Sequence, residues 1–380
     1  MSRPLPYPDL YTLKDRSRLP PALQTALFEL GKAIREGTLH PEQIDAFRVA
    51  LAELPASAVV DAAGVISKCA KLNWRVDWST CSQPSEQSVF DELKRDLPEG
   101  LLSVKAPFLT KELRLMQTPP HLCWLFAYHD SGYVRQMAMH LINMPPASPF
   151  DVGTLVYRMN DWVAAVRKAA LDSAKRLLPL TDTAVIADSA LFLLDYSKHL
   201  IRWDPEARAL VDTAMQRSEC LAAIIELICE SRDGTGAKGL KALLPNEDLD
   251  PHIPTLAAEA SQPHLRALAM QILLSGEVSW IDGYKPGLIE DYRGRFMQER
   301  NVVCRPLGLK VDLDFWIEAA ASDKSASVRK LAADALIARR ETASPALDAL
   351  ALQLCTDRNE AVAERARFYL EKRSSEPVMN

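Results

Sequence analysis

One pattern returns five times along the chain and constrains its fold more than any other feature. An acidic residue and a short polar turn precede a Val-Arg step, which opens a helix rich in alanine. The fullest copy is NDWVAAVRKAALDSAKRLL, residues 160–178. Its small and apolar residues recur at i, i+3, i+4 and i+7 and therefore share one helix face. They are Val166, Ala169, Ala170, Ser173, Ala174 and Leu177.

The spacing of the copies indicates a repeat. The apolar residue before each arginine marks a copy, and successive markers are separated by 32, 99, 63 and 34 residues. These gaps are about one, three, two and one units of a period in the low thirties, which is typical of helix pairs that stack on their neighbours. The pattern predicts an all-α fold. The markers are Val134, Val166, Leu265, Val328 and Val362.

These segments resemble HEAT repeats, in which an Asp at the turn precedes Val-Arg on the second helix. The match is good in two copies and degenerate in three, and it extends over residues 119–373. Asp130 stands one residue too close to its arginine, the copy at 261–274 has no acid at its turn, and Ala363 replaces the last arginine. The resemblance implies an α-solenoid of HEAT-like helix pairs, joined by a structural ladder of acids and arginines. The ladder residues are Asp130, Arg135, Asp161, Arg167, Arg266, Asp323, Arg329 and Asp357.

The chain divides into five predicted segments. Residues 1–118 have helical patterns but no copy of the repeat, and are expected to form a helical N-terminal domain or a divergent cap. HEAT-like repeats are predicted at 119–275 and again at 312–373. A basic insertion that contains Gly and Pro separates them at 276–311, and 374–380 is expected to be a flexible tail.

Charge is distributed unevenly along the chain. Its formal net charge is -5, yet residues 284–310 hold 6 Lys and Arg against 3 Asp and Glu. Residues 119–283 instead hold 14 basic against 20 acidic residues. A general binder of polyanions needs an excess of Lys and Arg, so nucleic acid is disfavoured as a partner.

Other features indicate a cytoplasmic protein, of a bacterial type. The N-terminal stretch MSRPLPYPDLYTLKDRSRLPP lacks the apolar run of a signal peptide. No later stretch approaches the roughly 20 apolar residues that span a bilayer, so we expect no membrane partner. The 7 cysteines never form a C-x-x-C pair and are expected to be reduced.

Asp161, Trp162 and Arg167 allow two interpretations. HEAT-like alkylpurine DNA glycosylases use Trp and Asp on such a scaffold to stabilise positive charge on the nucleoside. Adjacent helical residues point about 100° apart, however, so Asp161 and Trp162 do not readily converge on one ligand. In the structural interpretation Asp161 caps its helix and pairs with an arginine of the neighbouring repeat, while Trp162 fills space between layers. Because Asp323 and Arg329 repeat the offset, we favour the structural interpretation.

No motif indicates an enzyme, a metal or a cofactor. Cys123 and Asp130 lie with two histidines in HLCWLFAYHD, but His121 and His129 are about 12 Å apart along a helix. The sequence has no G-x-S-x-G, P-loop, H-E-x-x-H or G-x-G-x-x-G motif. We therefore expect no catalytic residues, no metal site and no cofactor.

Two segments are candidate partner-binding surfaces, because Trp, Tyr and Arg dominate the energetics of many interfaces. The first lies in the loop 73–87, where the alternative is that its indoles anchor the loop onto the first repeats. The second is the insertion, where the alternative is a solvated charged loop. The candidate residues are Trp74, Asp77, Trp78, Tyr292, Arg293, Arg295, Arg300 and Arg305.

The sequence thus predicts a non-catalytic HEAT-like scaffold or adaptor that binds another protein, as a regulator, an assembly factor or an inhibitor. The alternative is nucleic-acid binding, or an enzyme of the HEAT-like alkylpurine DNA glycosylase type. A HEAT-like chromophore lyase is a third possibility, which only the repeats support.

Overall fold

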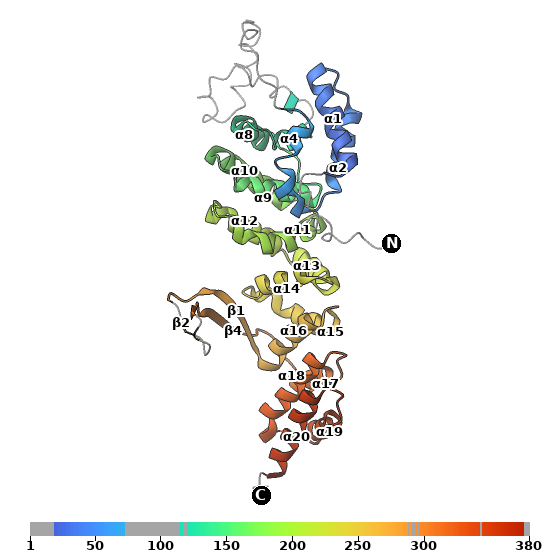
Figure 1. Ribbon diagram of the computed structural model, residues 1–380, viewed down its shortest axis with the longest axis vertical. Helices are drawn as coiled ribbons and strands as arrows, with labels where there is room; N and C mark the ends of the chain where they lie inside the picture. Colours follow the sequence, from blue (N-terminus) through green and yellow to red (C-terminus); the bar gives the residue numbers. More distant parts are fainter. Residues whose placement is uncertain are drawn as a thin grey trace. The chain divides into compact units, whose positions relative to one another are not determined.

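The computed structural model describes residues 19–72, 115–116, 121–287, 289–290, 294, 296–342 and 344–375. These residues are mainly helical, which confirms the all-α class, apart from one small β-arm. The chain forms two compact units, Met1–Arg217 and Ser218–Asn380 (Figure 1). The division falls within residues 119–275, for which the sequence predicts a single block of HEAT-like repeats.

The first unit begins with helices that start at prolines. Pro21 and Pro41 occupy the first helical positions, where a missing N–H has no cost. Gly37 ends the first helix in the left-handed conformation, with φ of 73°. The elements are α1 (Pro21–Glu36), α2 (Pro41–Ala52), η1 (Ala56–Ala58), α3 (Val59–Ala62) and α4 (Ile66–Cys69).

The repeated helices of the first unit follow. Helix α10 packs on both α8 and α9, while α11 packs on α9. The fully buried alanines of α10, Ala169, Ala170 and Ala174, allow its neighbours to approach closely. The elements are α7 (Leu122–Phe126), α8 (Gly132–Leu141), α9 (Pro149–Met159), α10 (Ala164–Leu177), η5 (Leu178–Leu180), α11 (Thr183–Tyr196), η6 (Ser197–His199) and α12 (Pro205–Met215).

The N-terminal helices pack directly onto these repeats. Arg48 of α2 binds both carboxylate oxygens of Asp151 on α9, at 3.0 and 2.7 Å. Gly153 allows α9 to approach η1 so closely that a Cβ there would lie 2.8 Å from the carbonyl oxygen of Ala56. These contacts join the N-terminal helices and the repeats in one compact unit.

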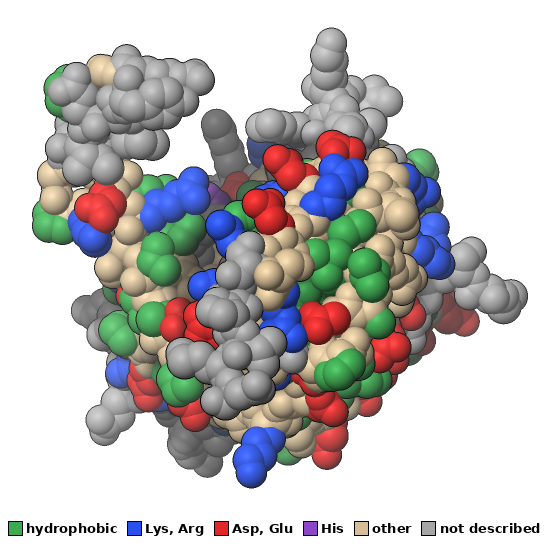
Figure 2. Space-filling model, turned by 90° about the horizontal axis from the view of Figure 1, so that it is seen from below, with side chains coloured by type: hydrophobic (Ala, Val, Ile, Leu, Met, Phe, Trp, Pro, Cys, Tyr) green, Lys and Arg blue, Asp and Glu red, His purple; other side chains and the backbone are tan. Residues whose placement is uncertain are grey.

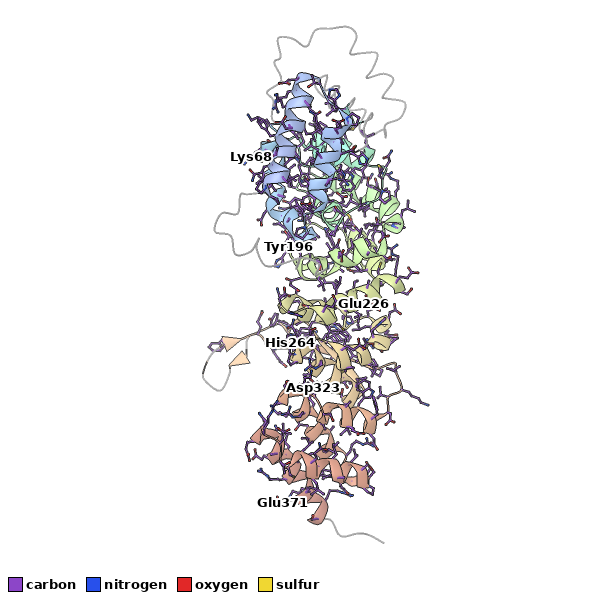
Figure 3. The ribbon with its side chains drawn as sticks, turned by 90° about the vertical axis from the view of Figure 1, so that its right-hand side faces the viewer. Lys68, Tyr196, Glu226, His264, Asp323 and Glu371 are labelled. Carbon is purple, nitrogen blue, oxygen red and sulfur yellow. The ribbon has the colours of Figure 1, made fainter. Side chains whose placement is uncertain are left out.

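The second unit also consists of successive helix pairs. Helix α16 packs on α15, α17 and α18, and α18 packs on α17 and α20. Asp323 lies in the turn between α17 and α18 (Figure 3). The elements are α13 (Ser218–Glu230), α14 (Gly234–Leu243), η7 (Glu247–His252), α15 (Ile253–Glu259), α16 (Pro263–Ser275), α17 (Leu313–Ala321), α18 (Ala326–Ala338), η8 (Arg340–Thr342), α19 (Pro345–Leu354) and α20 (Glu360–Ser375).

The predicted insertion contains a β-arm, which the all-α prediction missed. Strands β1 (Glu277–Tyr284) and β4 (Arg300–Pro306) pair antiparallel, with Ile281 opposite Val302. Short strands β2 (Ile289–Glu290) and β3 (Phe296–Met297) pair farther out. The arm begins where Gly276 ends α16 with φ of 69°. Its β-branched residues favour strands over helix, and the short apolar run carries no helical period.

The surface carries charges of both signs. On the face drawn in Figure 2, Lys and Arg are interspersed with Asp and Glu, and hydrophobic side chains lie among them. Within the described ranges, no helix has the length and apolar character that a membrane span requires.

Candidate functional site

Three arginines of the predicted ladder bind aspartates in one and the same geometry. In each, Nε and Nη2 donate to the two carboxylate oxygens of an Asp at a neighbouring turn. The Nε contacts measure 2.9, 2.8 and 2.6 Å, and the Nη2 contacts 2.9, 3.0 and 3.0 Å. Bidentate pairing of this kind is both strong and directional. We call these pairs the Arg–Asp rungs: Arg135–Asp161, Arg266–Asp323 and Arg329–Asp357.

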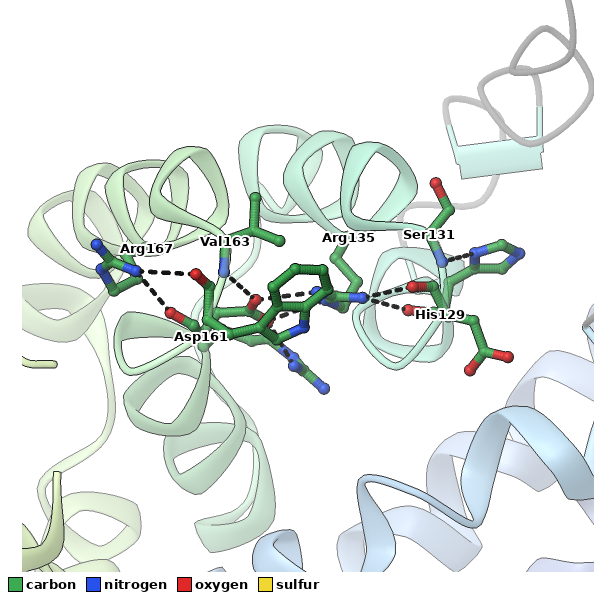
Figure 4. A network of polar contacts seen from close by, with 9 residues as sticks. His129, Ser131, Arg135, Asp161, Val163 and Arg167 are labelled. Carbon is green, nitrogen blue, oxygen red and sulfur yellow. Dashed lines mark hydrogen bonds and ion pairs between the residues drawn. The ribbon is translucent and has the colours of Figure 1, made fainter. Parts of the chain in front are cut away.

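The third nitrogen of each arginine binds the turn before its own helix. Nη1 of Arg135 donates to the carbonyls of His129 and Asp130, both at 2.9 Å (Figure 4). Arg266 and Arg329 make the same two contacts with the residues six and five positions before them. Each rung therefore joins two successive turns through one guanidinium group.

Asp161 lies at the centre of the most buried rung. Its carboxylate is completely inaccessible to solvent and also accepts from Nη1 of Arg158, at 2.7 Å, and from the N–H of Val163, at 2.9 Å. Burial alone raises the pKa of Asp161, but the bonds from Arg135 and Val163 and the charge of Arg158 outweigh it and lower that pKa. The carboxylate therefore stays ionised and faces inward. An acid that stabilises charge on a ligand must instead face the ligand.

Arg158 was not among the residues predicted from the sequence, although it stands three residues before Asp161 on the last turn of α9. Its guanidinium carbon lies 5.2 Å from the ring centre of Tyr128 and 5.0 Å from that of Tyr157. Asp161 follows Arg158 by three residues across the end of α9, so this separation of an arginine and an acid was the available signal.

Two predicted ladder residues do not form rungs. Asp130 accepts a hydrogen bond from the hydroxyl of Ser67, at 3.2 Å, where an arginine was expected. Arg167 donates from Nη1 to the carbonyls of Asp161 and Trp162, at 2.9 and 3.3 Å, as the rung arginines do to their own turns. Within the described residues, no carboxylate lies against its Nε and Nη2.

Trp162 does not fill space between layers, so that expectation was wrong. Its side chain is 73% exposed, because it stands in the turn after α9 rather than inside a helix interface. The indole lies over the guanidinium carbon of Arg135, 5.8 Å from its ring centre. Arg135 is nearly buried and already paired, so the ring covers a fixed cation and presents its other face to solvent.

Further exposed side chains lie in the neighbouring turns. Tyr133, in the first turn of α8, is 54% exposed, and Ile201, in the turn before α12, is 81% exposed. The turn before α12 is held against α9: the N–H of Arg202 donates to Oδ1 of Asn160 at 2.9 Å. Nε1 of Trp203 donates to the carbonyl of Val156 at 3.3 Å. Exposed apolar side chains that gather at one place are a feature of binding surfaces.

The predicted partner-binding residues fall into three groups. Arg300 lies exposed on β4, opposite Tyr284. Arg305 instead binds both carboxylate oxygens of Asp250, at 2.9 and 2.7 Å, so it anchors the β-arm to its own unit. The expectation that Arg305 grips a partner was wrong, because the base of the arm encloses its charge. Outside the described residues lie Trp74, Asp77, Trp78, Tyr292, Arg293 and Arg295.

The histidine and cysteine stretch around Cys123 does not assemble ligands. Cys123 is buried, burial raises the pKa of its thiol to about 12, and its Sγ donates to the carbonyl of Met116. Within the part of the chain that the structure describes, no three His, Cys, Asp or Glu side chains form a group that could hold a metal ion.

Comparisons of this chain with protein-family models, with curated proteins and with solved structures find no match. The geometry of the turns around Trp162 is therefore the starting point for a functional proposal.

Proposed function

We propose that this chain is a non-catalytic, HEAT-like α-solenoid scaffold that binds another protein through the turn surface around Trp162. We define this turn surface by Tyr133, Trp162, Arg167, Ile201 and Arg202. The single observation that carries the proposal is the exposure of Trp162 over the fixed guanidinium of Arg135. A large ring held in one position loses little conformational entropy when a partner covers it, and Trp is enriched among residues that dominate interfaces.

The repeated rungs support the scaffold part of this proposal. Three Arg–Asp rungs of the same geometry, one in the first unit and two in the second, each join neighbouring turns, as is expected of repeats that stack on one another. The scattered thiols of the sequence favour a cytoplasmic location for such an adaptor.

The buried carboxylate of Asp161 supports the non-catalytic part. In the glycosylase alternative this acid would have to approach the nucleoside, whereas here Arg135, Arg158 and Val163 occupy its oxygens. The chain's net charge of -5 also gives nucleic acid little general attraction.

The test is affinity capture with the tagged 380-residue chain, comparing wild type with Trp162→Ala. We expect a stoichiometric protein partner that the variant retains at least tenfold more weakly, because hot-spot residues contribute about 2 kcal/mol or more. Val49→Ala is the matched control, because Val49 is an exposed apolar residue on α2 and its loss should leave capture unchanged.

Two outcomes would contradict the proposal. One is a partner that binds both variants as tightly as wild type. The other is release of free bases from alkylated DNA by the purified protein, with loss of that activity in Asp161→Asn.

A further inference from the structure

Arg167 has the geometry of a rung arginine without its acid. Its Nη1 binds the carbonyls of the residues six and five positions before it, as in the three filled rungs. In those rungs this contact turns Nε and Nη2 toward the carboxylate of the next turn. The same edge of Arg167 is therefore oriented by its own turn, and Arg167 is only partly buried.

The next turn explains why the rung is empty. Asp161, Asp323 and Asp357 each stand six residues before the arginine position of their own helix. The residue six positions before Arg208 of α12 is Arg202, so a second cation replaces the acid. Arg202 is exposed, and its N–H is bonded to Asn160, the neighbour of Asp161.

Arg167 and Arg202 thus belong to two turns that contact each other. In the filled rungs, the equivalent positions hold an arginine and an aspartate. Asn160 binds the backbone of Arg202, and the carbonyl of the adjacent Asp161 binds Arg167. Trp162 and Ile201, each next to one of these residues in the chain, are among the most exposed apolar side chains. Two cations with exposed apolar neighbours are complementary to an acidic group beside an apolar one.

We propose that this open rung, Arg167 with Arg202, binds the carboxylate of an Asp or Glu on a partner protein, while Trp162 contacts an apolar side chain beside it. The inference rests on the proposed function and names the chemistry of its partner. In the three filled rungs, the arginine binds the carboxylate of an aspartate. Bidentate contact gives such an acid both affinity and a fixed orientation.

A protein acid fits this place better than a nucleic-acid backbone. Asp204 and Glu206 begin α12 directly after Arg202, and both are exposed. A chain of phosphates that reached Arg202 would bring further negative charge toward them, whereas a single carboxylate would not.

The test uses a peptide of residues 351–362 of this chain with Cys355 replaced by Ser, labelled at its N-terminus with a fluorophore. It contains Asp357, the natural occupant of a filled rung, together with the apolar Leu352 and Leu354. Anisotropy titration with the 380-residue chain should give binding about tenfold tighter than for the same peptide with Asp357→Asn, the preference expected of one charged bidentate contact.

Variants of the protein test whether the open rung causes the preference for the peptide that contains Asp357. Arg167→Ala and Arg202→Ala should each reduce the tenfold preference to near one, while Lys168→Ala, an exposed cation one residue away, should retain it. Arg202→Asp should place the missing acid against Arg167, abolish peptide binding and raise the urea midpoint of unfolding. That variant separates loss of the site from loss of folding.

Three results would overturn the inference: equal binding of both peptides, absence of binding, or a preference that survives Arg167→Ala. Arg167-dependent binding of a labelled 12-nucleotide single-stranded DNA in place of the peptide would assign the rung to phosphate instead. If Trp162→Ala releases a captured partner while the peptides show no preference, the proposed function stands and the acidic occupant is wrong. If Trp162→Ala captures the partner as well as wild type does, the proposed function itself is wrong.

Discussion

Arg135 binds Asp161 through two parallel contacts of 2.9 Å, and both side chains are almost completely buried. The same guanidinium holds the carbonyls of its own turn and lies beneath the indole of Trp162. One side chain thereby fixes α8 to the turn before α10 and determines where an exposed aromatic ring stands. Removal of the Asp161 carboxylate leaves the guanidinium groups of Arg135 and Arg158 buried without an anion, which is the costly case for an ion pair.

Asp161→Asn should therefore destabilise the first unit. We expect a loss of about 3 kcal/mol in the free energy of unfolding, since Arg135 and Arg158 lose the charge they share. Urea titration followed by circular dichroism measures this loss. Asp61→Asn, at an exposed position of α3, is the control and should change stability by less than about 0.5 kcal/mol. Equal stabilities of the two variants would show that the rung contributes nothing net.

The Arg–Asp rungs also predict that the stability of the protein depends on pH. Hydrogen bonds from Arg329, followed by smaller effects, hold the pKa of Asp357 below its ordinary value of 3.8. A depressed pKa in the folded state stabilises the protein above the ordinary value, and that contribution disappears as pH falls through the folded pKa.

The free-energy difference between wild type and Asp357→Asn should accordingly be constant from about pH 7 to pH 5 and shrink below about pH 4. Urea titrations at successive pH values measure it. A difference that grew in acid would contradict the ion pair.

Gly31→Ala should weaken the packing of the N-terminal helices. Alanine normally favours a helix over glycine by up to about 1 kcal/mol. A Cβ at position 31 would lie only 1.8 Å from the backbone oxygen of Ala70, so α1 would have to move. We expect a net loss of about 1–3 kcal/mol by thermal or urea unfolding. Gly64→Ala is the matched control, because nothing lies within 4 Å of its added Cβ, and a similar loss in both variants would reject this explanation.

Arg305→Ala should loosen the base of the β-arm. It leaves the buried carboxylate of Asp250 without its main partner, although Gly308 still donates to it at 2.7 Å. We expect the amide of Gly308 to exchange hydrogen at least tenfold faster, measured by mass spectrometry, and the second unit to lose about 3 kcal/mol. Arg300→Ala, on the same strand but exposed, should leave both values unchanged. Unaltered exchange in Arg305→Ala would show that other contacts hold the arm.

The positions of the helices and of their ends can be predicted from the sequence, because the residues that determine them act locally. Prolines at first helical positions, Gly37 and Gly276 at helix ends, and the 3.6-residue period of α10 act within a few residues of themselves. The β-arm was not predicted because β1 and β4 are 16 residues apart in the chain and each needs the other to complete its hydrogen bonds.

By itself the sequence determined that Asp161, Asp323 and Asp357 are the acidic residues of a repeated turn. Only the tertiary structure decided their partners. Arg266 reaches Asp323 across 57 residues of chain, Arg305 turns inward to Asp250, and Trp162 faces solvent. The physical reason is that charge and periodicity are properties of a segment, whereas burial and the choice of an ion-pair partner depend on which segments the fold brings together.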